Sequence, residues 1–263
     1  MHDNMKGLAA GPADSDMDGA RLALQEVAER QPPTIGVVGV SGTGKSSTIN
    51  ALFRTSLPVS HTRACTKEFR NVELAVEATA GPSAGRKTRL RVVDAPGLGE
   101  DLRKDPDYLG MYKDNLPRCD AILWVLSARN RAVALDQTYL SSLTEHLDRL
   151  VFGVNQVDLV SPVNWNRRSN LPSEEQEDHI LEIIEDRKAR LASLTGWSRP
   201  VVGYSAGRSY RLQELFTELV DTCPPGRSWM FGAIKNFRYD QFRRASSAEP
   251  VDGSAAPPQR DRT

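Results

Sequence analysis

Eight residues near the start of the chain, GVSGTGKS at positions 39–46, fit the pattern GxxxxGK[ST]. They follow an apolar run at 35–38, which predicts a strand, and they lead into a helix-like stretch over 46–53. Glycines let the backbone coil tightly, so that successive N–H groups and the positive end of the helix face one anion. The pattern therefore predicts a strand, a loop that holds nucleotide phosphates, and a helix.

In this interpretation the Lys45 ammonium reaches the β- and γ-phosphate oxygens, and the Ser46 hydroxyl binds Mg²⁺. The alternative is a glycine-rich turn that holds no ligand. The phosphate contacts are expected from Gly39, Ser41, Gly42, Thr43, Gly44, Lys45, Ser46 and Ser47.

The composition excludes several classes of protein. Lys and Arg total 34 and Asp and Glu also total 34, so no overall basic field favours nucleic acid, although a local basic patch stays open. No segment has the roughly 18 consecutive apolar residues of a membrane span, and residues 1–18 lack the apolar core of a signal peptide. Three widely spaced cysteines favour reduced thiols in a cytoplasmic protein.

Strand and helix patterns alternate along most of the chain. Strands are expected at 34–40, 68–78, 89–93, 121–127, 150–155 and 200–205, and helices at 16–30, 45–54, 106–116, 136–149, 174–195 and 210–221. The runs at 121–126 and 150–154 are apolar on both faces, as in buried parallel strands. We therefore expect an α/β, three-layer fold with a mostly parallel central sheet and helices on both faces.

The same pattern predicts three regions. Residues 1–31 form an N-terminal tail and an amphipathic helix, residues 32–223 form the main domain, and residues 224–263 form a basic, aromatic segment that leads into a disordered tail. The segment 226–244 could bind an anionic membrane or RNA, or pack on its own domain, and we favour the last alternative.

Four short motifs follow the phosphate loop, and three of them stand where a predicted strand ends. They are DAPG at 94–97, NQVD at 155–158 and SA at 205–206, together with threonines at 62 and 66 before the second strand. Ligands of doubly wound sheets bind at the carboxyl ends of the strands. The order and placement match the five motifs of the GTPase superfamily.

With these motifs the chain resembles the bacterial Era-like P-loop GTPases of the TRAFAC class. Within them it resembles the YfjP/YeeP group, which is related to the immunity-related GTPases. The resemblance covers roughly residues 34–222 and rests on segments 39–47, 58–66, 94–100, 119–126 and 155–158. It implies a GTPase domain that binds GTP and GDP with Mg²⁺ and acts as a molecular switch.

The resemblance assigns base recognition to Asn155, Gln156, Asp158, Ser205 and Ala206. The Asp158 carboxylate would accept hydrogen bonds from guanine N1–H and the 2-amino group, a donor pair that adenine lacks. An ATPase is therefore the least favoured interpretation. The family pattern is NKxD, and because Gln156 replaces its lysine, we expect selectivity to survive with weaker affinity.

Magnesium is expected on Ser46, Thr66 and Asp94, with Asp94 acting through water. Thr66 is preferred as the switch threonine because it directly precedes the second strand, and Thr62 is the alternative. Lys45, Thr66 and the Gly97 N–H are the expected catalytic groups around the γ-phosphate. Cys65 could sense redox state, but a space-filling role is favoured.

Turnover is expected to be slow. Related enzymes orient the attacking water with a glutamine directly after the DxxG glycine, and this chain has Leu98 there. Unassisted hydrolysis should run on the order of 10⁻⁴ to 10⁻² s⁻¹. The rivals are a GTP-dependent scaffold with negligible turnover and a self-assembling GTPase at the membrane periphery. Expected partners are guanine nucleotide, a second copy at the switch face and a protein effector.

Overall fold

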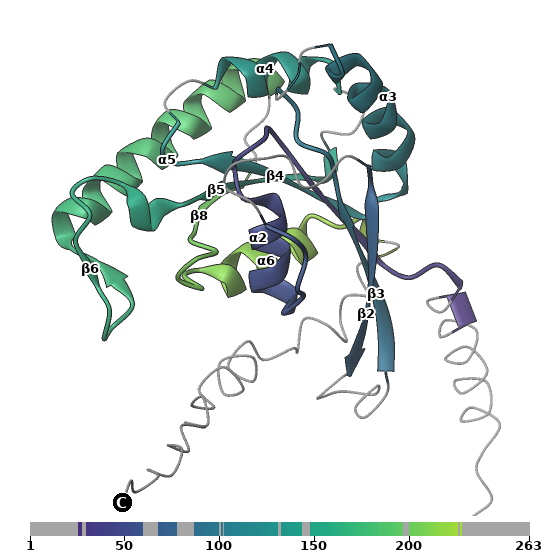
Figure 1. Cartoon of the computed structure of the whole chain (residues 1–263), viewed down its shortest axis with the longest axis horizontal. Helices are drawn as coiled ribbons and strands as arrows, with labels where there is room; N and C mark the ends of the chain where they lie inside the picture. Colours follow the sequence, from purple (N-terminus) through teal and green to yellow (C-terminus); the bar gives the residue numbers. More distant parts are fainter. Residues whose placement is uncertain are drawn as a thin grey trace, which may run out of the picture.

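A six-stranded sheet forms the centre of the molecule (Figure 1). The computed structural model describes residues 26–27, 30–59, 68–77, 87–99, 101, 103–130, 133–143, 148–196, 200–225 and 227. The sheet order is β2-β3-β1-β4-β5-β8. The strands are β1 (Thr34–Val38), β2 (Arg70–Glu77), β3 (Lys87–Asp94), β4 (Ala121–Ser127), β5 (Leu150–Asn155) and β8 (Val201–Gly203).

Five of these strands run parallel, and β2 pairs antiparallel with β3 at one edge of the sheet. The β4 segment is buried along nearly its whole length, which explains its continuous apolar sequence. Since parallel strands place their carboxyl ends at one edge, the loops after β1, β3, β5 and β8 meet there. The expected three-layer α/β fold is confirmed.

Helices cover both faces of the sheet (Figure 1). One face carries α2 (Lys45–Phe53) and α6 (Leu212–Asp221), and the other carries α3 (Asp105–Asn115), α4 (Ala134–Ser141) and α5 (Glu174–Thr195). Side chains of β4 alternate between the two cores: Leu123 packs with α2 and α6, and Trp124 packs with the other three helices. This alternation follows from the two-residue period of a strand.

Most observed bounds lie within two residues of the expected ones, and two differences are larger. The helix predicted over 136–149 begins two residues earlier and ends at Ser141, because Ser142 and Leu143 donate i→i−3 bonds that tighten the last turn. The structure also contains a small hairpin, β6 (Trp165–Asn166) and β7 (Leu171–Pro172), between β5 and α5. Of the helix predicted over 16–30, residues 26, 27 and 30 are described, and they are helical.

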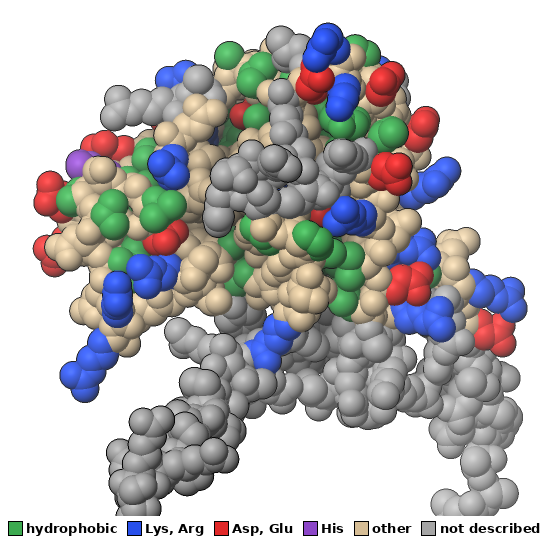
Figure 2. Space-filling model, in the orientation of Figure 1, with side chains coloured by type: hydrophobic (Ala, Val, Ile, Leu, Met, Phe, Trp, Pro, Cys, Tyr) green, Lys and Arg blue, Asp and Glu red, His purple; other side chains and the backbone are tan. Residues whose placement is uncertain are grey.

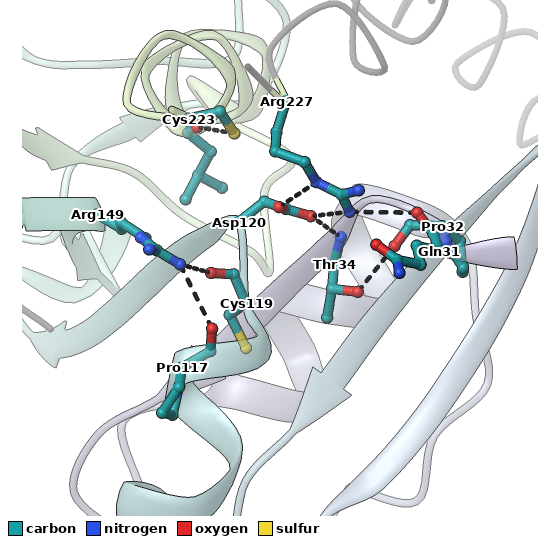
Figure 3. Close-up of polar contacts among 10 residues, drawn as sticks. Gln31, Pro32, Thr34, Pro117, Cys119, Asp120, Arg149, Cys223 and Arg227 are labelled. Carbon is teal, nitrogen blue, oxygen red and sulfur yellow. Dashed lines mark hydrogen bonds and ion pairs between the residues drawn. The ribbon is translucent and has the colours of Figure 1, made fainter. Parts of the chain in front are cut away.

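The amino ends of β1 and β4 meet in a polar cluster (Figure 3). Asp120 accepts the Thr34 N–H at 2.8 Å, and it accepts Nε and Nη2 of Arg227 at 2.7 and 3.0 Å. Arg227 Nη2 also donates to the Gln31 carbonyl at 3.2 Å. We call these four residues the Arg227 clasp, and it joins the chain beyond α6 to the entry of β1.

The surface and the thiols agree with the composition. Figure 2 shows basic and acidic side chains interspersed on one face, as expected from the equal counts. Cys119 and Cys223 are buried free thiols, and burial raises the pKa of each to about 12. Among the described residues, no helix has the length and apolar character needed to cross a membrane.

Candidate functional site

The loop between β1 and α2 has the backbone geometry that its glycines make accessible. Gly39 and Gly44 have φ angles of 133° and 90°, in a region that side chains disfavour. A Cβ at Gly39 would lie 2.6 Å from the Val125 carbonyl oxygen, and one at Gly44 would lie 2.4 Å from Asn155 Nδ2. Neither position has room for a side chain, because Val125 and Asn155 lie close to the loop backbone.

Side chains inside the loop hold its shape. Thr43 Oγ1 donates to the Val40 carbonyl at 2.9 Å, and the buried Lys45 Nζ donates to the same carbonyl at 3.1 Å. The ammonium therefore lies against the loop backbone. Ser47 is half-buried in the first turn of α2.

The segment after β3 lies directly against this loop. Val40 and Leu98 form a parallel bridge, in which Ser41 N donates to the Leu98 carbonyl at 2.8 Å. A Cβ on Gly97 would lie 2.8 Å from Ser41 Cα and 3.1 Å from Lys45 Nζ. Gly97 therefore stands beside the lysine, and the Leu98 side chain is fully buried.

Ser46 and Asp94 form a pair of hard oxygen donors next to the loop. The Ser46 hydroxyl donates to Asp94 Oδ2 at 2.9 Å, and Asp94 is fully buried. Among the described residues, no three His, Cys, Asp or Glu side chains gather into a cluster of metal ligands. Mg²⁺ beside a nucleotide needs one or two protein oxygens, with water and phosphate completing the shell, so this pair fits that ion.

At the end of β5, Asn155 joins three loops. Its Nδ2 donates to the Thr43 carbonyl at 2.9 Å, and its Oδ1 accepts the Ala206 N–H at 3.0 Å. Asn155 is buried, and both its amide nitrogen and its amide oxygen bond to protein groups. The phosphate loop and the segment after β8 are thereby held in register.

Residues 156–158 form the part of the site where base recognition is expected. Gln156 has φ 67°, and its amide accepts the Ser127 hydroxyl at 2.6 Å and donates to the Gly42 carbonyl at 3.5 Å. Asp158 lies in the short helix η3 (Val157–Leu159), and its Oδ1 accepts the hydroxyl of the buried Ser205 at 2.6 Å. The structure thus brings the expected base-recognition residues together at one end of the sheet.

Three residues that support the DAPG segment were not identified from the sequence. Tyr112 donates from its hydroxyl to the Pro96 carbonyl at 2.7 Å, and Asp105 accepts the Gly99 N–H at 3.0 Å. Tyr139 donates to the second Asp105 oxygen at 2.5 Å. Desolvation raises the pKa of both tyrosines, so their hydroxyls stay protonated as donors. Their positions in α3 and α4 follow helical spacing, so no local signal separates them from core residues.

Several expected site residues lie outside the described part of the chain. These include both candidate switch threonines, Thr62 and Thr66, with Cys65 between them, and the basic, aromatic segment 226–244 apart from Arg227. The Trp165 ring packs edge-on against Tyr210 at 5.0 Å between centroids.

Known proteins share both the sequence and the fold. Residues 34–156 match the family model described as 50S ribosome-binding GTPase. YfjP of Escherichia coli K12, described as an uncharacterized protein, is 33% identical over 155 residues, which cover 58% of this chain and 50% of YfjP. The chain therefore spans about half the length of this curated relative.

Solved structures of Era share the fold at lower identity. Era of Aquifex aeolicus bound to GDP·AlF4⁻ is 19% identical, with a TM-score of 0.54 over 73% of this chain and 56% of that one. Era in complex with MgGDPNP and part of 16S ribosomal RNA is 19% identical, with a TM-score of 0.53 over 73% and 57%. At this identity the likeness shows the fold alone.

Proposed function

We propose that the chain is an Era-like P-loop GTPase, a Mg²⁺-dependent switch that binds GTP and hydrolyses it slowly to GDP and phosphate. The observation that carries the proposal is the connection between two loops of the site. Asn155 bonds to the Thr43 carbonyl on one side and to the Ala206 N–H on the other, which ties a phosphate loop to a base-reading loop.

The side chain of Asp158 supports guanine as the base. A carboxylate is an acceptor only, and Ser205 supplies a hydrogen bond to one of its oxygens. Guanine presents two adjacent donors that would complete its hydrogen bonding, whereas adenine would leave a largely buried carboxylate unsatisfied. Such a loss discriminates by several kcal/mol at a site of this kind, about 10⁴-fold or more.

Ser46 and Thr66 would hold Mg²⁺ directly, with Asp94 acting through water and Thr62 as the alternative to Thr66. When bound, the ion neutralises charge on the β- and γ-phosphates. Lys45 would bind the same oxygens, and the Gly97 N–H would meet the γ-phosphate. Phosphoryl transfer asks the protein mainly to position groups and stabilise charge, which suits a site built from backbone amides and one lysine.

A scaffold with negligible turnover is the second candidate, and the Leu98 geometry favours it. The side chain is fully buried and its backbone pairs with the phosphate loop, so it cannot approach an attacking water. A group from a partner or from the substrate phosphate would then have to orient that water. Single-turnover phosphate release at high protein concentration separates the two: no release supports the scaffold.

The first test is calorimetric titration with GDP, a non-hydrolysable GTP analogue and ADP in Mg²⁺. Wild-type protein should bind both guanine nucleotides and not ADP, and Asp158→Ala should abolish that binding. Equal binding of ADP would contradict the base assignment. Asp178→Ala, an exposed carboxylate on α5, is the matched control and should bind as wild type.

The proposal also includes partners beyond the nucleotide. We include a second copy at the switch face, a protein effector, and RNA or an anionic membrane at 226–244 within the proposed C-terminal region 224–263. One Era structure contains 16S ribosomal RNA, which supports testing RNA first. Liposome flotation with and without a GTP analogue tests the membrane alternative, and failure under both conditions removes it.

A further inference from the structure

The hairpin β6–β7 lies outside the five GTPase motifs, yet it bonds to the base-reading loop. Asn170, in the turn of the hairpin, donates from Nδ2 to the Arg208 carbonyl at 3.0 Å. The two residues are 38 positions apart in sequence, so this is a tertiary contact between separate loops. Arg208 follows Ser205 and Ala206, which belong to the proposed base site.

Asn170 is itself fixed in position. Its Oδ1 accepts the Trp165 indole N–H at 3.1 Å, and Trp165 packs edge-on against Tyr210. Asn170 has φ 56°, a conformation that asparagine tolerates better than most residues. Both ends of its amide are therefore used, one inside the hairpin and one on the neighbouring loop.

Arg208 in turn holds the carboxylate. Its N–H donates to Ser205 Oγ at 3.0 Å, and that hydroxyl donates to Asp158 Oδ1 at 2.6 Å. The guanidinium Nε lies 3.7 Å from Asp158 Oδ2, close enough for an ion pair but too far for a hydrogen bond. The lone pairs of Oδ2 thus stay open to a base edge while a positive charge stands beside it.

This arrangement offsets a departure in the NQVD motif. Gln156 carries no charge, and its amide is engaged by Ser127 and Gly42. Among the described residues, Arg208 places a cation beside the Asp158 carboxylate. Its side chain is 36% exposed and that of Asp158 is 13% exposed, so the pair lies at the edge of solvent, where Coulomb attraction is only partly screened.

We propose that Asn170 and Arg208 are positioning residues for guanine recognition, with the hairpin β6–β7 holding the loop that orients the Asp158 carboxylate. The inference rests on the proposed function, since it assumes that Asp158 reads guanine. Loss of the Asn170 hydrogen bond should let the 205–210 loop relax, so that the carboxylate meets the two guanine donors at poorer angles. Nucleotide should then leave faster and the base should be read less strictly.

The experiment measures release of fluorescent GDP by stopped flow, and competition by GDP, inosine diphosphate and ADP. Inosine lacks the 2-amino group and so reports one of the two Asp158 contacts. Asn170→Asp keeps the acceptor for Trp165 but loses the donor to Arg208. Asn170→Gly removes the side chain without strain at the positive φ, and Arg208→Gln removes the charge. Arg167→Ala, an exposed arginine in the same hairpin, is the control.

The two Asn170 variants should release GDP about three- to tenfold faster, the usual effect of one net hydrogen bond. Arg208→Gln should speed release by a similar factor through loss of the ion pair with Asp158, and all three variants should narrow the preference for GDP over inosine diphosphate. A structural defect alone would weaken both nucleotides equally. Release and preference equal to those of Arg167→Ala would overturn the inference while leaving GDP binding by the wild type intact. Wild-type protein that fails to bind GDP would instead overturn the proposed function.

Discussion

Glycines of one loop tolerate substitution to different degrees, because the space around each differs. Gly42 and Gly44 both have positive φ, at 79° and 90°, so alanine carries a similar backbone penalty at either. A Cβ at Gly44 would lie 2.4 Å from Asn155 Nδ2, whereas one at Gly42 meets nothing within 4 Å. Alanine would therefore clash with a neighbouring side chain at Gly44 and not at Gly42.

We predict that Gly44→Ala weakens GDP binding at least tenfold more than Gly42→Ala does. The added methyl group would displace Asn155 from the Thr43 carbonyl and so disconnect the phosphate loop from the base loop. Calorimetry on both variants measures the difference, and Gly42→Ala controls for backbone strain. Equal losses would mean that conformation, rather than contact with Asn155, limits this loop.

Asp136 gives the protein a pH dependence opposite to that of most carboxylates. The residue accepts the Trp124 indole N–H at 2.8 Å, and desolvation raises its pKa from 3.8 to about 6 although that hydrogen bond opposes the rise. The folded state binds this proton more tightly than the unfolded chain does. Its contribution to stability is complete below pH 4 and is lost as pH rises through 6.

Asp136→Asn should therefore stabilise the protein relative to wild type by about 2 kcal/mol more at pH 7.5 than at pH 4.5. The asparagine oxygen can still accept the indole N–H, so packing is retained. Urea denaturation at the two pH values measures the change. Asp107→Asn, an exposed carboxylate on α3, is the control and should show no comparable change.

At the scale of elements, α3 anchors the segment that follows β3. The Tyr112 ring is fully buried, and its hydroxyl donates to the Pro96 carbonyl and accepts the Gly39 N–H at 3.4 Å. One side chain thus joins the DAPG segment to the start of the phosphate loop. Phenylalanine would fill the same volume and leave both backbone groups without this partner.

Tyr112→Phe should lower the free energy of unfolding by about 1–3 kcal/mol and speed hydrogen exchange at residues 97–99. Exchange followed by mass spectrometry gives the local effect, and urea denaturation gives the global one. Tyr108→Phe, on the half-buried side of the same helix, should change neither by a similar amount. Unchanged exchange at 97–99 would show that the loop is held by other contacts.

The order of strands and helices could be predicted because buried strands and amphipathic helices leave distinct periods in the sequence. The end of α4 could not, since Leu140 and Leu143 continue the helical spacing, and the i→i−3 backbone bonds of Ser142 and Leu143 leave no mark in the pattern of apolar residues. Motif residues of the site carry a local signature. Asn170 carries none, because its hydrogen bond to Arg208 joins residues 38 positions apart.

At the scale of the whole molecule, the two ends of the parallel strands carry different groups of polar residues. The carboxyl ends carry the proposed nucleotide site, and the amino ends of β1 and β4 carry the Arg227 clasp (Figure 3). Asp120 is 9% exposed at its side chain and Arg227 is 25% exposed. Hydrogen bonding to Asp120 raises the pKa of Arg227, so the guanidinium stays charged at any physiological pH.

Arg227→Ala should lower the free energy of unfolding by about 1–3 kcal/mol, because a nearly buried carboxylate would lose both hydrogen bonds from the guanidinium and keep the one from the Thr34 N–H. A double-mutant cycle with Asp120→Asn should give a coupling of about 1 kcal/mol that shrinks in 1 M salt, since part of the pair is exposed to solvent. GDP affinity should stay at the wild-type value in all variants, because the clasp lies at the far end of the strands. A change in GDP affinity would instead mean that the chain beyond α6 is coupled to the nucleotide through the sheet, and would identify the clasp as part of the switch.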